Sequence, residues 1–96
     1  MTAAERFDAD TWAGIDESKK LGYNPIRYMQ MVKEHGAVKT AKRVLHNPTL
    51  ADGFVTLAYL RGRPDLTTEA LVVRYQDEGL FTDEELNTAR NRLGQV

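Results

Sequence analysis

The sequence predicts an all-α fold, a compact bundle of five or six short helices. Apolar residues recur at helical spacing between regularly placed glycines and prolines, and no stretch alternates for long enough to indicate a strand. The chain has 96 residues, of which 42% are hydrophobic and 28% charged, a composition typical of one globular domain. We therefore expect residues 10–96 to form a single helical domain and residues 1–9 to be a frayed N-terminus.

The first two predicted helices are bounded by turn residues. The first helix is expected over residues 10–21, where Trp12 and Ile15 share a face and Gly22 ends the helix. Asn24 and Pro25 predict the start of the second, with Asn24 as the N-cap and Pro25 as the first helical residue. Gly36 is expected to end it.

The third helix, predicted over residues 37–46, has two distinct faces. One face is apolar and is expected to be buried: Ala37, Val38, Ala41, Val44 and Leu45. The other is a basic stripe, defined by Lys39, Lys42, Arg43 and His46, which we expect to face solvent. On this prediction, replacing Lys42 and Arg43 together leaves the fold intact.

Three more helices are predicted after the stop at Asn47-Pro48. The fourth covers residues 50–61 and buries Leu50, Phe54 and Leu57 on one face. The fifth starts near Thr67 or Thr68, after a turn over residues 62–65, and carries an apolar stripe of Leu71, Val72 and Tyr75. The last begins with a capping box in which Thr82 and Glu85 bond each other's backbone N–H groups, and it ends at Gly94.

Charge is distributed unevenly along the chain, although the net charge is only −1. Residues 19–46 hold seven lysines and arginines against one carboxylate, whereas residues 1–18 hold five carboxylates against one arginine. Residues 75–96 are also acidic. The basic middle can attract an anionic partner, or the acidic ends can neutralise it by folding over it. The sequence leaves both interpretations open.

The sequence contains no pattern typical of an active site. There is no cysteine, which excludes disulfides and thiolate chemistry. Ser18 lacks a nucleophile context, and His35 and His46 lack the spacing of metal ligands. The acidic run Asp83-Glu84-Glu85 is explained by its place in the first turn of a helix. We therefore expect no enzymatic activity, no catalytic or metal-binding residue and no cofactor.

No segment indicates export or membrane insertion. The first residues have neither a basic nor an apolar region, so they do not form a signal peptide. The longest apolar run, residues 70–73, is far too short to cross a bilayer. We expect a cytoplasmic protein.

The candidate functional surface is basic. It comprises the basic stripe and two arginines of the following turn: Lys39, Lys42, Arg43, His46, Arg61 and Arg63. Arg61 and Arg63 can bind a phosphate or carboxylate, or can pair with Asp65 and nearby carbonyls. The leading hypothesis is a non-enzymatic interaction module that docks a protein partner or another domain. The alternative is a nucleic-acid-binding module using the basic face of the third helix, although the helix after it is too apolar to read bases.

Several short motifs also form a pattern between residues 22 and 93. They are Gly22-Tyr23-Asn24-Pro25-Ile26-Arg27-Tyr28, Met31-Val32, Gly36, Ala41-Lys42-Arg43-Val44-Leu45, Asp52-Gly53-Phe54, Leu57, Gly62-Arg63, Asp65-Leu66-Thr67, Glu69-Ala70-Leu71-Val72 and Leu80-Phe81-Thr82. In these motifs the chain resembles an uncharacterised small bacterial helical domain that occurs alone or attached to larger proteins. Pro64 stands where that domain usually has leucine. The resemblance implies a helical fold and no particular activity.

Overall fold

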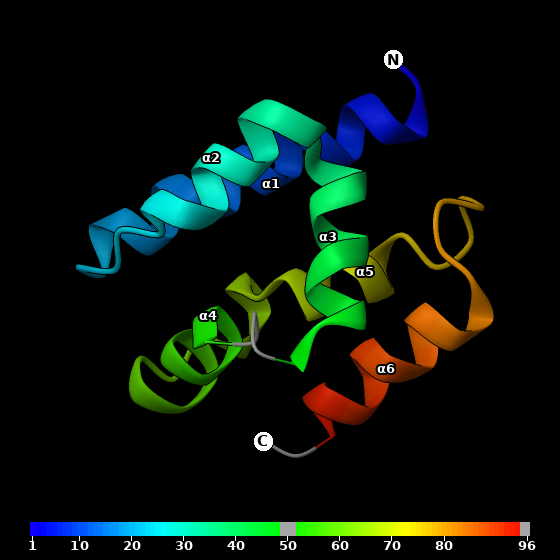
Figure 1. The fold of residues 1–96 in the computed structure, drawn as a ribbon. Coiled ribbons are helices and arrows are strands. Elements are labelled where there is room, and N and C mark those ends of the chain that lie inside the picture. Colours follow the sequence, from blue (N-terminus) through cyan, green and yellow to red (C-terminus); the bar gives the residue numbers. More distant parts are fainter. Residues whose placement is uncertain (49–51, 95–96) are drawn as a thin grey trace.

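The predicted all-α fold is confirmed by a computed structural model, which describes residues 1–48 and 52–94 (Figure 1). The described ranges contain six α-helices, a π-helical turn, a 3-10 turn and no strand. The elements are α1 (Ala3–Lys20), α2 (Ile26–His35), α3 (Ala37–His46), α4 (Asp52–Val55), η2 (Thr56–Leu60), η3 (Pro64–Leu66), α5 (Thr68–Arg74) and α6 (Asp83–Leu93).

Helix α3 occupies the centre of the molecule. It contacts α1 and α2, and also α5 and α6 (Figure 1). The main core lies between these helices: Phe7, Val32, Ala37, Ala41, Leu45, Leu71, Val72, Leu86 and Ala89. Phe7 is completely buried, and its ring meets Tyr75 edge-on at 5.2 Å between ring centroids.

Helix α1 begins at Ala3, so the predictions of a start near residue 10 and of a frayed segment over residues 1–9 were wrong. Thr2 and Glu5 form a capping box that the sequence analysis overlooked. Glu5 N donates to Thr2 Oγ1 at 3.1 Å, and Thr2 N donates to Glu5 Oε1 at 2.9 Å. The extra turns bring Phe7 into the core.

Helices α2 and α3 follow the prediction except at one end. Pro25, not Asn24, is the N-cap of α2, and no side chain caps the helix. Asn24 instead contributes its carbonyl oxygen, which accepts from Ile26 N at 2.9 Å. Gly36 ends α2 as predicted, with a φ of 85° that a side chain would strain, and α3 follows at once.

The fourth predicted helix is present as α4 followed by the π-helical turn η2, here called the α4–η2 segment (residues 52–60). Its buried side chains include Phe54 and Leu57, as predicted, whereas Leu50 lies outside the described residues. The segment closes with a bond from Arg61 N to Thr56 O at 3.0 Å. Gly62 then turns the chain at a φ of 65°, and Pro64 opens the 3-10 turn, where its missing N–H is not needed.

The last two helices start as predicted. Thr67 caps α5 by accepting from Ala70 N at 3.1 Å. The predicted capping box of α6 is present, with Glu85 N donating to Thr82 Oγ1 at 3.1 Å and Thr82 N donating to Glu85 Oε1 at 2.8 Å. Gly94 occupies the C-cap of α6. Within the described ranges, no helix combines the length and apolarity needed to cross a bilayer.

Candidate functional site

The structure brings half of the basic stripe onto one acidic side chain. Lys42 Nζ donates to Glu85 Oε1 at 2.7 Å, and His46 Nε2 lies 2.8 Å from Glu85 Oε2. The side chain of Glu85 is only 3% exposed because the first turn of α6 packs against α3. The prediction that Lys42 faces solvent and is independent of the core was therefore wrong.

Glu85 is held as a carboxylate by its surroundings. Burial by itself raises the pKa of Glu85, but the hydrogen bonds from Lys42, Thr82 N–H and His46 together outweigh burial and lower the pKa to about 2. An acidic end of the chain has thus folded over part of the basic middle.

The other residues of the candidate surface divide into two groups. Lys39, Arg43 and Arg61 are exposed and make no ion pair with any described residue. Arg63 instead forms two hydrogen bonds to Asp65, at 3.0 Å and 2.9 Å, and thereby lowers the pKa of the Asp65 carboxyl. The sequence left open whether Arg63 binds an external anion or pairs with Asp65, and in the structure it pairs with Asp65.

A second buried ion pair was missed entirely. Arg92 Nη1 donates to Glu69 Oε2 at 2.9 Å, and the Glu69 side chain is 1% exposed. The same guanidinium donates to the carbonyls of Val44 and Leu45 at 3.1 Å and 3.3 Å. Arg92 of α6 therefore caps the C-terminal end of α3 and also neutralises a buried acid of α5.

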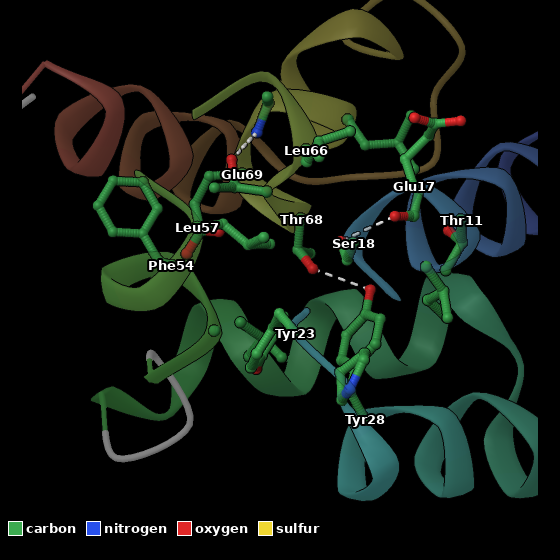
Figure 2. Close-up of a pocket in the computed structure, with 18 of the residues that line it drawn as sticks. Thr11, Glu17, Ser18, Tyr23, Tyr28, Phe54, Leu57, Leu66, Thr68 and Glu69 are labelled. Atoms are coloured by element: carbon green, nitrogen blue, oxygen red, sulfur yellow. Dashed lines mark hydrogen bonds between the residues drawn. The ribbon is translucent and has the colours of Figure 1, made fainter. Parts of the chain in front are cut away.

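The described structure contains a cavity of about 700 Å³ (Figure 2). It lies between α1, α2, α5 and the α4–η2 segment. Its apolar wall includes Ile15, Met31, Val44, Phe54, Leu57 and Leu71. In Figure 2, Phe54 and Leu57 lie across the cavity from Thr11 and Ser18 of α1. A volume of this size and an apolar wall are typical of small-molecule sites.

A few hydroxyl groups interrupt this apolar wall. Thr68 Oγ1 and the Tyr28 hydroxyl lie 2.8 Å apart and join α5 to α2. Burial raises the pKa of Tyr28 to about 12, so its hydroxyl stays protonated at neutral pH. Ser18 donates to Gly14 O at 2.8 Å, whereas the buried Thr11 Oγ1 has no hydrogen-bond partner among the described residues.

The outer face of the α4–η2 segment is apolar as well. Val55, Tyr59 and Leu60 are 47%, 52% and 75% exposed, although they follow closely on the buried Phe54 and Leu57. Arg61, which is exposed and outside every ion pair of the described structure, comes directly after them. This helical segment thus carries apolar side chains on both its inner and its outer face.

Neither the cavity nor this outer face was predicted from the sequence. The available signal for the cavity was the series Thr11, Ile15, Ser18, whose spacing places small polar groups on the buried face of α1. Among the described residues, no three histidines, aspartates or glutamates are grouped as metal ligands would be. Comparisons with protein-family models, with curated proteins and with solved structures found no match to the chain.

Proposed function

We propose that the protein is a non-enzymatic interaction module that docks a partner protein through the outer face of the α4–η2 segment. One observation carries the proposal, namely the exposed apolar row of Val55, Tyr59 and Leu60 on a segment whose inner face is already buried. A helix that is apolar on every side is normally covered on every side. The proposal includes a cytoplasmic setting, with which a chain free of cysteine is compatible.

The chemistry of this face specifies the partner. Leu60 adjoins Arg61, which makes no ion pair within the described structure, so the complementary surface is apolar and bears a carboxylate opposite Arg61. Tyrosine and arginine, which this face carries at positions 59 and 61, are enriched among the residues that contribute most to binding at protein interfaces. The alternative of nucleic-acid binding through α3 has less support, because Lys42 and His46 are bound to Glu85.

Site-specific photocrosslinking in cells that natively express the protein tests this proposal. A benzophenone amino acid at position 60 is expected to give a discrete adduct with one other protein, while the same group at the exposed position 87 of α6 is not. The purified partner should bind the wild-type chain and lose at least tenfold in affinity with Leu60→Ser or Arg61→Glu. Absence of an adduct, or equal adducts at both positions, would refute the proposal.

The nucleic-acid alternative has its own measurement. Fluorescence anisotropy with labelled duplex DNA should show weak or no binding at physiological salt. Micromolar binding that Arg43→Ala abolishes, with affinity falling steeply as salt rises, would favour that alternative over protein docking.

A further inference from the structure

The inner side of the α4–η2 segment faces the cavity, which is a second candidate binding site. The cavity behind it has the volume of a small-molecule site, and its walls come from α1, α2, α5 and the α4–η2 segment, with Val44 of α3 and two residues of η3. Leu60 and Val55 do not line it, so it is distinct from the proposed docking face. Two features, its hydroxyl groups and its charges, identify the chemistry of a ligand.

One pair of hydroxyl groups in the cavity has a hydrogen left to donate. Tyr28 and Thr68 share one hydrogen between their two oxygens, so whichever group donates it, the pair retains one further hydrogen. Thr11 Oγ1 has no hydrogen-bond partner among the described residues, but it is covered by its neighbours and is not open to a ligand. A ligand that satisfies the Tyr28 and Thr68 pair presents an acceptor oxygen to it.

The charges around the cavity favour an anion. Three lining carboxylates already have cationic partners within the chain: Glu17 with Lys20, Asp65 with Arg63 and Glu69 with Arg92. A fourth, Asp10, accepts from the Tyr75 hydroxyl at 2.6 Å. The lining arginines Arg27 and Arg74, by contrast, make no ion pair with any described residue.

We propose that this cavity binds a long-chain carboxylic acid. The apolar chain lies against Ile15, Phe54 and Leu57, and an acyl oxygen accepts from the hydroxyl pair of Tyr28 and Thr68. Arg27 and Arg74 supply the positive charge that the carboxylate requires. Of the charged lining groups outside the three ion pairs, the two arginines outnumber the one carboxylate, Asp10, so a molecule with an apolar tail and a single anionic head matches this pocket.

Titration of the full chain with sodium dodecanoate tests the proposal. Calorimetry should give saturable one-to-one binding, and NMR with ¹³C-labelled dodecanoate should give contacts from its chain to Ile15 and Leu57. Methyl dodecanoate and dodecylammonium should bind at least tenfold more weakly. Equal binding of the ester or the amine would refute the assignment of an acid, and absence of saturable dodecanoate binding would refute the proposal altogether.

Variants separate the roles of the lining groups. Tyr28→Phe removes one hydroxyl and should weaken dodecanoate binding about tenfold. Should Tyr28→Phe fail to fold, as judged by circular dichroism, Thr68→Val removes the other hydroxyl of the pair and should weaken dodecanoate binding to a similar extent. Arg27→Gln should weaken binding about two- to fivefold, whereas the matched control Arg43→Gln, which does not line the cavity, should not.

Two further outcomes keep this proposal independent of protein docking. Leu60→Ser should leave dodecanoate binding unchanged, so a failure of the docking proposal does not affect this one. If a partner protein, rather than dodecanoate, shifts the NMR signals of Ile15 and Leu71, then the cavity is a groove for a protein segment and the acid assignment is wrong.

Discussion

The two sides of α3 differ in where their charged and apolar side chains lie and in what those side chains contact. On the side of α5 and α6, carboxylates from distant parts of the chain meet cations in buried pairs, as Glu69 meets Arg92 and Glu85 meets Lys42. On the side of the α4–η2 segment, apolar side chains line a cavity and face solvent, and Arg61 makes no ion pair with any described residue. The first arrangement stabilises the fold, and the second leaves apolar side chains exposed and a cation without an ion pair in the described structure.

This difference makes Arg92 the most sensitive position that we can name. Arg92→Ala leaves the buried Glu69 carboxylate without its cation and two carbonyls of α3 without a donor. We expect the free energy of unfolding, measured with urea, to fall by about 3–5 kcal/mol. The control Arg90→Ala, on the exposed side of the same helix, should cost less than about 1 kcal/mol. Equal losses of stability in Arg92→Ala and Arg90→Ala would show that the buried pair with Glu69 does not stabilise this side of α3.

The Glu85 cluster predicts a dependence of stability on pH. Because the pKa of Glu85 in the folded chain, about 2, lies below its ordinary 4.5, the stabilisation is complete above about pH 4.5 and is lost as pH falls towards 2. Between about pH 4.5 and pH 2, the free energy of unfolding of the wild type should fall by about 2 kcal/mol more than that of Glu85→Gln. Urea unfolding at each pH measures this difference. Parallel curves for the two proteins would contradict this prediction.

Lys42 and Arg43 form a matched pair of neighbouring cations with different environments. Lys42→Ala should lower the free energy of unfolding by about 1.5–2 kcal/mol, because it removes a charge-assisted bond to a buried carboxylate. Arg43→Ala should change it by less than about 0.5 kcal/mol, since Arg43 is exposed and makes no ion pair in the described structure. Thermal or chemical unfolding that ranked them the other way would restore the original expectation of a solvent-facing stripe.

The cap of α6 is expected to contribute less than the ion pairs that it supports. Thr82→Ala removes the hydroxyl that accepts from Glu85 N, so stability should fall by about 1 kcal/mol in urea unfolding. Thr82→Ser keeps a hydroxyl in place and serves as the control. A loss as large as that of Arg92→Ala would mean that the cap of α6 stabilises the fold as much as the buried pair of Arg92 and Glu69 does.

The smallest effect is expected on the opposite side of the molecule. Leu60→Ser changes a side chain that is 75% exposed, so the midpoint of thermal unfolding should shift by no more than the equivalent of about 0.5 kcal/mol. A larger loss would indicate that Leu60 stabilises the monomer, in which case its exposure would no longer support a docking face.

Local signals explain why much of the fold could be predicted. The stop at Gly36, the limits of α3 and the cap of α6 depend on groups within four residues of one another, and all three are as predicted. The start of α1 was readable in the same way, because Thr2 and Glu5 form the same type of box as Thr82 and Glu85. That error arose from treating a terminal segment as frayed, not from a missing signal.

The sequence by itself determined the helices, their main boundaries and the apolar face of α3, because these follow from the helical repeat and from short-range hydrogen bonds. Only the tertiary structure decided which charges meet. Glu85 lies 43 residues from Lys42, and Arg92 lies 23 residues from Glu69, so no local pattern pairs them. The cavity likewise exists only where α1, α2, α5 and the α4–η2 segment converge, since its shape depends on how these elements pack rather than on any one of them.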